Sequence, residues 1–420
     1  MGSYNSDLAK ETIPADVLPL LVSLLSQENK YLKRAAVLVF RSAAKHSEIL
    51  AQTVVDSGAL SVIIDKCLSD FTDHPLQESA VWTIGNIAKH SLALASTASS
   101  SLPLLIQTAG QTSDVTLKRI SLAALADIAR HSSELALQIL SIDPLFLASL
   151  LTGLSNEDSG MRKQASACLS QIVKHDTKLF PMESVPAMIL ALQDPVISKN
   201  IATVLRELAR DPIAARELVS RGALPALVEC VAGEAKLPAV MALGYIGVDE
   251  EMARSVFTAN PIPVLKNALI NDPDDIVKGA IVWTLGQLGK HCSDLANRLA
   301  ENDIFRRIFA VFFHDSSSSD LRAKCIESLA LLIPQTTTLG PLEVLVSCVE
   351  TDAELKVFLL DRFSQLLSSD PAGRKSFVQS GCLEKIQEWN DKEKVNKLFP
   401  TELVNFYSPG YQAELLKQLD

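Results

Sequence analysis

The chain repeats itself about every 40 residues, and this self-similarity constrains its fold more than any other feature. The string Ala44-Lys45-His46-Ser47 returns at residues 88–91 and, with Arg in place of Lys, at residues 129–132. Weaker copies align with His175, Asp211 and His291, so that the successive spacings are 44, 41, 44, 36 and 80 residues, the last being two periods. A unit of this size cannot bury its own apolar face, so the repeats must stack to form a core.

Each repeat has room for three helices. Apolar residues before the Lys-His string recur in steps of three, four and seven, as in Ala80, Val81, Ile84, Ile87 and Ala88. A second apolar helix comes after the string, and a third comes after a glycine that suits a left-handed helix end, as at Gly58, Gly222 and Gly381. Three helices in about 42 residues is the armadillo period. We therefore expect an all-α fold, a right-handed α-solenoid of armadillo repeats.

The phase of the repeat also predicts the domain organisation. Residues 15–381 are expected to form about eight to nine tandem repeats. Residues 1–14 match the segment that comes after each histidine, and we interpret them as the remnant of a truncated N-terminal repeat. Residues 382–420, which include Phe406-Tyr407-Ser408-Pro409-Gly410-Tyr411, are expected to form a C-terminal tail that packs on the last repeat.

Composition excludes several classes of protein. Hydrophobic residues make up 48% of the chain, yet no apolar run approaches the ~18 residues that a membrane span needs. The net charge of −10 disfavours non-specific nucleic-acid binding. Residues 1–210 carry 18 basic and 20 acidic side chains, and the rest carries 21 and 29, so a basic surface is expected in the first half.

No catalytic or metal-binding pattern is present in the sequence. The seven cysteines are scattered, none within four residues of another, which excludes the paired spacing of zinc sites and favours a reducing compartment. Neither a phosphate-binding loop nor a nucleophile elbow occurs. We therefore expect a protein that is not an enzyme and that uses no cofactor and no metal.

The helix that ends in the Lys-His string displays one polar stripe. Positions four apart stay nearly on one face of a helix. Counting back from each histidine by four, eight and twelve gives residues that are mostly polar or small among apolar neighbours, which predicts a solvent-facing, concave groove. The candidate protein-binding residues in this groove are Arg34, Arg119, Lys163, Lys199, Trp82, Asn86, Trp283, His46, His90, His131, His175 and His291.

The five histidines at the end of the stripe have two interpretations. A histidine ladder could bind a partner or sense pH. Alternatively, Lys-His at a helix C-terminus complements the helix dipole and caps free carbonyls, which also explains the accompanying Lys or Arg. Capping is the simpler interpretation. Shared metal binding is disfavoured, because helices of successive repeats lie ~10 Å apart.

The sequence Trp82-Thr83-Ile84-Gly85-Asn86 resembles the importin-α and β-catenin types of armadillo protein, in which a Trp and an Asn four apart grip extended peptides. The full pair occurs once in this chain, since the Trp position elsewhere holds residues such as Leu38 and Ala123. A continuous ladder is thus absent, which disfavours a nuclear-import adaptor. A soluble adaptor that binds extended peptides in its groove remains the alternative function.

Armadillo repeats with a recurrent Lys-His-Ser, followed by a Tyr-Ser-Pro-Gly-Tyr tail, resemble the sperm-associated antigen six type of ciliary central-apparatus protein, from Tyr4 to Asp420. The resemblance implies a non-enzymatic scaffold on a central-pair microtubule of the axoneme, which supports central-apparatus integrity and flagellar motility. Its implied location is the cytoplasmic cytoskeleton of the cilium or flagellum. Its implied partners are other central-apparatus proteins, with tubulin and a second copy of the chain as further candidates, and neither nucleic acid nor membrane.

Overall fold

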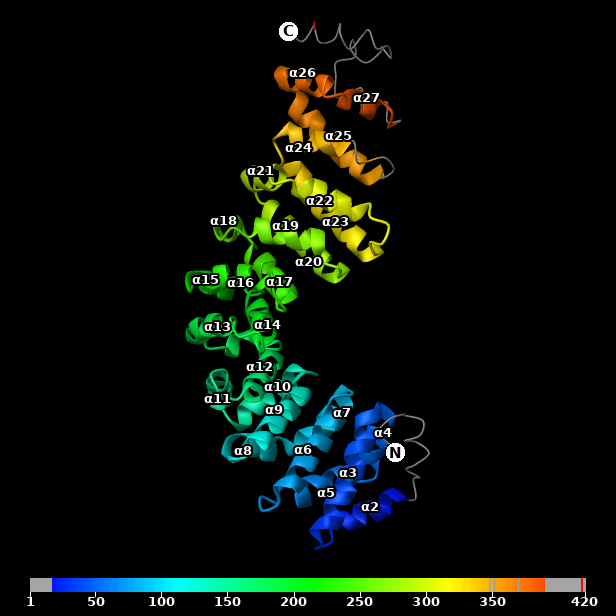
Figure 1. Cartoon of the computed structure of the whole chain (residues 1–420), viewed down its shortest axis with the longest axis vertical. Helices are drawn as coiled ribbons and strands as arrows, with labels where there is room; N and C mark the ends of the chain where they lie inside the picture. Colours follow the sequence, from blue (N-terminus) through cyan, green and yellow to red (C-terminus); the bar gives the residue numbers. More distant parts are fainter. Residues whose placement is uncertain (1–16, 347–348, 350–352, 369, 390–416, 418–420) are drawn as a thin grey trace. The chain divides into compact units, whose positions relative to one another are not determined.

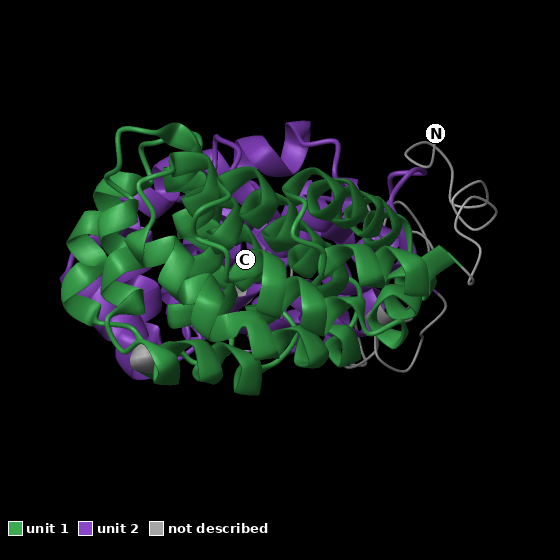
Figure 2. Ribbon diagram, turned by 90° about the horizontal axis from the view of Figure 1, so that it is seen from below, with its two compact units in different colours: residues 1–208 green, residues 209–420 purple. Residues whose placement is uncertain are grey.

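The structure is a computed structural model that describes residues 17–346, 349, 353–368, 370–389 and 417. Helices joined by short loops account for this part of the chain, which contains no strand, and the all-α prediction is confirmed. The contacts divide the chain into two compact units, residues 1–208 and 209–420 (Figure 2). Each unit is a stack of three-helix repeats (Figure 1).

In unit 1 each repeat consists of a first, a second and a third helix. The first helices are α4 (Glu48–Asp56), α7 (Leu92–Ala98) and α10 (Ser133–Ile142). The second helices are α2 (Val17–Leu25), α5 (Ala59–Ile63), α8 (Leu102–Gln111), α11 (Phe146–Gly153) and α13 (Val185–Ala191). The third helices are α3 (Lys30–His46), α6 (His74–Ala88), α9 (Val115–Ala129), α12 (Ser159–Val173) and α14 (Ser198–Leu208).

Unit 2 has the same order of helices. Its first helices are α15 (Pro212–Ser220), α18 (Glu250–Thr258), α21 (Ser293–Glu301) and α26 (Pro371–Gln379). Its second helices are α16 (Ala223–Cys230), α19 (Ile262–Asn271), α22 (Ile304–Phe312), α24 (Leu339–Val346) and α27 (Cys382–Gln387). Its third helices are α17 (Lys236–Ile246), α20 (Asp275–Gly289), α23 (Ser319–Leu332) and α25 (Ala353–Ser368).

Short helices replace or extend some of these elements. A π-helix, Ile64–Leu68, continues α5, and the 3₁₀-helix Ser99–Ser101 leads into α8. After α12 the first helix is reduced to the 3₁₀-turns Thr177–Leu179 and Met182–Ser184, and after α23 to Ile333–Gln335. The reduction after α12 explains why the spacing between His175 and Asp211 is only 36 residues.

The core of each unit lies between successive third helices. In unit 1 each of α3, α6, α9 and α12 packs on the next third helix, and in unit 2 α17, α20 and α23 do the same. Several third helices, among them α3, α6, α9, α12, α20 and α23, start at a side chain that accepts a backbone N–H, as Asp114 does from Thr116 at the start of α9. Ala80, Ile84 and Ile87 of α6 are fully buried, as their helical spacing predicts.

A left-handed residue joins the first helix to the second in several repeats. Gly58, Gly222 and Gly381 have φ values of 77°, 83° and 76°, which confirms the helix end predicted for these glycines. Asn260 and Asp303 stand at the same junction with φ of 55° and 66°. Their short polar side chains tolerate this conformation better than most, which is why the repeat continues there without glycine.

The structure describes only part of the two segments that flank the predicted repeat region. The remnant expected at residues 1–14 lies outside them, as does most of the tail expected at 382–420. Residues 382–387, however, form α27 with Leu383 and Ile386 buried, so a second helix continues beyond the expected boundary at Gly381. The described part of the chain contains no single helix long and apolar enough to cross a membrane, although α10 and α11, bent by 95°, would suffice together in length and composition.

Candidate functional site

The third helices α9 and α12 each expose one stripe along their C-terminal half, at the positions that the sequence predicted. Between residues 121 and 129 of α9 only Ala123 and Asp127 reach solvent, and between residues 165 and 173 of α12 only Ala167 and Gln171 do so. We call the stripes of unit 1 the third-helix face. It comprises Arg34, Leu38, Ser42, His46, Glu78, Trp82, Asn86, His90, Arg119, Ala123, Asp127, His131, Lys163, Ala167, Gln171, His175, Lys199 and Thr203.

The histidines on this face bridge neighbouring repeats. His90 Nε2 lies 2.7 Å from the carbonyl oxygen of Ala44, and His175 Nε2 lies 3.2 Å from that of Arg130. In unit 2, His291 Nε2 lies 2.8 Å from the carbonyl oxygen of Gly247. Each carbonyl belongs to the end of the third helix one repeat earlier, where helices leave acceptors free. These three histidines therefore cap helices, and each one caps the third helix of the preceding repeat.

Two histidines depart from this pattern. The buried Nε2 of His131 has no hydrogen-bond partner among the described residues, although the Ala88 backbone lies close enough to raise the pKa of the ring. Burial outweighs that effect and lowers the pKa of His131. The Nε2 of His46 is also buried without a partner in the described part of the chain.

A lysine supports the same junction between α3 and α6. Lys89 Nζ donates to the Lys45 carbonyl oxygen and to Asn86 Oδ1, at 3.1 Å each. Burial lowers the pKa of Lys89, whereas burial raises the pKa of the nearby Asp127 carboxyl. Both shifts arise because the packed helices exclude water from charged groups.

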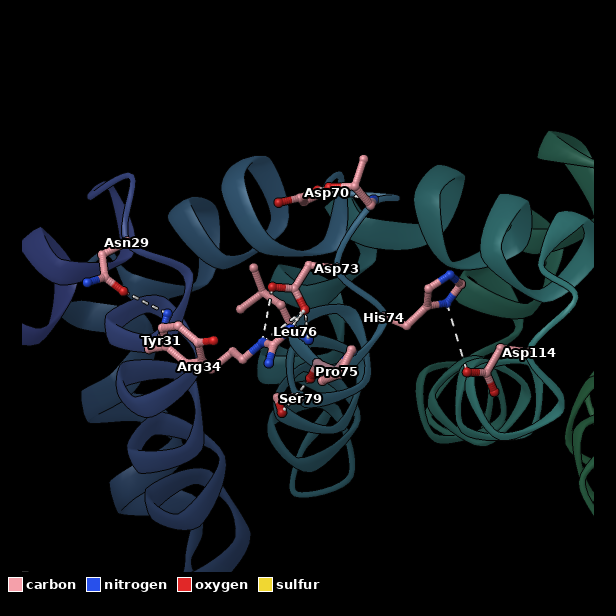
Figure 3. Close-up of polar contacts among 11 residues, drawn as sticks. Asn29, Tyr31, Arg34, Asp70, Asp73, His74, Pro75, Leu76, Ser79 and Asp114 are labelled. Carbon is pink, nitrogen blue, oxygen red and sulfur yellow. Dashed lines mark hydrogen bonds and ion pairs between the residues drawn. The ribbon is translucent and has the colours of Figure 1, made fainter.

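Arg34, the first cation of the predicted groove, is held by an ion pair between two repeats. Its Nη2 lies 2.7 Å from Asp73 Oδ1 and its Nε lies 3.0 Å from the same oxygen (Figure 3). Asp73 is 6% exposed and also accepts the N–H of Leu76, so it caps α6 while it binds α3. Burial raises the pKa of Asp73. The hydrogen bonds from Arg34 and the Leu76 N–H lower it by more, so the net shift is downward. Arg34 is therefore not a free cation, because its guanidinium already joins two repeats, and its contact with a partner stays a prediction.

The same kind of clamp recurs between other third helices. Arg162 of α12 donates to Asp194 Oδ2 at 2.7 Å, ahead of α14. Lys236 of α17 pairs with Asp272, ahead of α20. These carboxylates were not among the residues predicted from the sequence, although an acidic residue shortly before most third helices was a visible signal.

The other predicted cations differ in their surroundings. The guanidinium of Arg119 lies against Gly160 at the start of α12, where an added Cβ would be 2.9 Å from it. Lys163 and Lys199 are exposed, and neither forms an ion pair within the described residues. These two lysines are thus exposed cations of the third-helix face that are available to a partner.

The Trp and Asn positions differ in accessibility, and their contact with a peptide stays a prediction. Trp82 is 39% exposed with the Arg41 guanidinium 5.0 Å from its ring centroid. Asn86 is only 9% exposed, and its carbonyl oxygen is already bonded to Lys89. Trp283 packs edge-on against Tyr245 at 5.1 Å and fills the space beside Gly244, where a Cβ would lie 2.4 Å from its ring.

The titratable side chains of the third-helix face are the groups that could bind a metal or react. Among the described residues no three His, Cys, Asp or Glu side chains lie together so that they could hold a metal ion. The imidazoles are bonded to backbone or have a buried Nε2, and the Asp127 carboxylate pairs with Arg130. The arrangement offers an accessible row of Leu38, Trp82 and Ala123 beside two free lysines, which suits contact with another protein.

Comparison with known proteins agrees with this fold. No family model matches the chain. The mouse and human proteins named sperm-associated antigen 6 are each 33% identical to it over 167 residues, which is 38% of this chain and 32% of each relative. A crystal structure titled as an engineered protein superposes with a TM-score of 0.73 and 19% identity, covering 96% of this chain and 99% of the other.

The fold and these matches define an all-α protein of the armadillo-repeat class. Within that class the chain is similar to sperm-associated antigen 6 over the 167 matched residues. The match covers 38% of the chain, a shorter span than the resemblance from Tyr4 to Asp420 predicted, and the chain matches about a third of the length of those relatives.

Proposed function

We propose that the chain is a non-enzymatic protein-interaction scaffold of the axonemal central pair, where it supports central-apparatus integrity and flagellar motility. The observation that carries the proposal is the 33% identity to sperm-associated antigen 6 over 167 residues. The stacked third helices support it, because they present a broad side-chain surface and use their titratable groups to join repeats. The proposed location is the cytoskeleton of the cilium or flagellum, and the proposed partners are other central-apparatus proteins.

Expression of the fluorescently tagged chain in flagellated cells tests this proposal. We expect signal along the axoneme that survives detergent extraction of the membrane and soluble protein. The double variant of this chain, Lys163→Glu with Lys199→Glu, shows whether the free lysines of the third-helix face contribute to axonemal binding. A diffuse or nuclear signal from the unsubstituted chain, with none on the axoneme, would contradict the proposal.

A soluble adaptor that binds extended peptides is the second candidate, and the exposed Trp82 beside Arg41 is what favours it. Such an adaptor needs an accessible amide to bond the peptide backbone, whereas Asn86 is 9% exposed and its Oδ1 already accepts from Lys89. Replacement of both Trp82 and Asn86 by Ala separates the two functions. Partner binding that persists in this variant argues against the adaptor.

A further inference from the structure

A cavity of about 340 Å³ opens in unit 1 between the second helices α8 and α11, apart from the third-helix face. Its apolar lining includes Ile106 of α8, Leu122 of α9, and Phe146 and Leu150 of α11. Its volume is within the range of sites that hold small ligands or anchoring side chains. At its far end Gly153 of α11 approaches Ala165 of α12 so closely that an added Cβ would lie 2.9 Å from the Ala165 side chain.

Polar side chains also line this cavity. Lys118, Ser149 and Asn156 are among its lining residues, and no hydrogen bond or ion pair of Lys118 Nζ, Ser149 Oγ or Asn156 Nδ2 is formed within the described residues. The lining also contains one carboxylate, Asp143, whose Oδ1 accepts the N–H of Leu145 at 2.9 Å. An amino group with unbonded amide and hydroxyl donors nearby complements a carboxylate.

Two exposed aliphatic side chains lie close in sequence to the cavity residue Asp143. Ile142 and Leu145 stand on either side of Asp143 and are 43% and 74% exposed. They belong to the α10–α11 segment, whose length and composition match those of a membrane span even though it is bent by 95°. An interface hot spot combines a pocket that an anchor side chain enters with apolar neighbours that exclude water, and Ile142 and Leu145 could supply such neighbours.

We propose that this cavity is a docking site for a short segment of a partner protein, in which one bulky apolar side chain enters between α8 and α11 and a neighbouring Asp or Glu meets Lys118. The proposal rests on the scaffold function above in so far as it takes the occupant to be a protein. It adds a second binding surface, formed by second helices and the loop before α12, to the third-helix face.

Gly110 provides a sharp test, because it lines the cavity in the last turn of α8 and an added Cβ would meet no atom within 4 Å. Gly110→Phe therefore adds a large side chain at the cavity wall, attached through a Cβ that meets no atom within 4 Å, and replacing a helical glycine favours folding. Gly110→Ala is the matched control, since it gives the same backbone change and leaves the cavity open. Lys118→Gln removes the proposed carboxylate contact, and Lys163→Gln is its control on the third-helix face.

The probe is a phage-displayed library of random twelve-residue peptides selected on the full chain. We expect enriched peptides that place a bulky apolar residue within four positions of Asp or Glu. By fluorescence anisotropy such a peptide should bind the parent, Gly110→Ala and Lys163→Gln alike. It should bind Gly110→Phe and Lys118→Gln at least tenfold more weakly, with thermal unfolding of both at or above the parent temperature.

Three results would overturn the proposal: no shared pattern among the enriched peptides, equal binding to Gly110→Phe and Gly110→Ala, or sensitivity to Lys163→Gln without sensitivity to Lys118→Gln. Should Gly110→Phe fold poorly, the Lys118→Gln and Lys163→Gln pair decides alone. Axonemal targeting is scored separately in the tagged parent chain. If peptides do not bind but the chain still reaches the axoneme, the docking site is wrong and the scaffold function is unaffected. If the chain does not reach the axoneme, the scaffold function is wrong.

Discussion

At the scale of single residues, backbone conformation and burial decide what each position tolerates. Gly222 has a φ of 83°, a conformation that costs other residues about 1–2 kcal/mol. An added Cβ there would meet no atom within 4 Å, so the whole cost of a substitution lies in the backbone. The glycine is thus required by its dihedral angle and by nothing that it contacts.

Gly222→Ala should lower the free energy of unfolding by about 1 kcal/mol. Chemical denaturation followed by circular dichroism measures the change. Gly233→Ala is the control, because Gly233 has no positive φ and its added Cβ would meet only the Cys230 carbonyl at 3.8 Å. Equal effects of the two substitutions would show that the left-handed conformation is not the cause.

His131 should make stability depend on pH. Burial lowers its pKa, helped by Arg130 and His175 and opposed by the Ala88 backbone and Asp127. Because the folded pKa lies below that of the unfolded chain, about 6.5, the unfolded chain binds the proton first as pH falls. The stabilising effect of the neutral ring is therefore complete above about pH 6.5 and declines below it.

Denaturation curves at pH 7.5 and pH 5.5 check this dependence. His131→Gln should flatten the loss of stability that the parent chain shows between the two values. Parallel losses in parent and variant would assign the dependence to other groups.

At the scale of elements, repeats are joined by side chains that reach from one third helix to the next. Asp73 is the clearest case, since it caps α6 through the Leu76 N–H and binds Arg34 of α3. Asn can replace a carboxylate as a helix cap, but it cannot form the ion pair.

Asp73→Ala should therefore destabilise unit 1 by about 1 kcal/mol more than Asp73→Asn. This difference is the usual cost of losing a helix cap. The pKa of Asp73 is lowered in the fold, so its contribution is present above about pH 4 and is lost as pH falls through the folded value. Asp73→Asn should then show a shallower loss of stability in acid than the parent. If the two variants unfold identically, the capping role of Asp73 is wrong.

At the scale of the whole molecule, charge is distributed unevenly along the chain. The net charge is −10, yet residues 1–210 are close to neutral and carry the two free lysines of the third-helix face. An acidic partner should therefore meet unit 1, by an attraction that salt screens.

Replacement of Lys163 and Lys199 by Glu should weaken binding of a polyglutamate peptide, most strongly at low salt, as measured by fluorescence anisotropy. The variant with Lys66→Glu and Lys178→Glu has the same net charge and changes exposed lysines outside the third-helix face. Arg34 is left intact because its reversal would place two carboxylates against each other at Asp73. Equal weakening by both variants would mean that net charge alone, and no particular surface, governs the attraction.

Much of the fold could be predicted because repeat phase and helical periodicity are local properties of the chain. The Lys-His strings located the ends of the third helices, and Gly58, Gly222 and Gly381 located the left-handed junctions. The exposed stripe followed from helical geometry alone. Asn260 and Asp303 were not recognised at the same junction, because the sequence signal there was glycine.

The sequence by itself determined that this protein is a stack of three-helix repeats with one accessible stripe on each third helix, because periodicity fixes which side chains are buried. Only the tertiary structure decided which polar residues are free. Arg34 and Asp73 are 39 positions apart, and His90 is 46 positions from the carbonyl it caps, so their pairing depends on how one repeat packs on the next. The cavity beside Gly110 arises in the same way, from the packing of α8, α9, α11 and α12, and no local pattern encodes it.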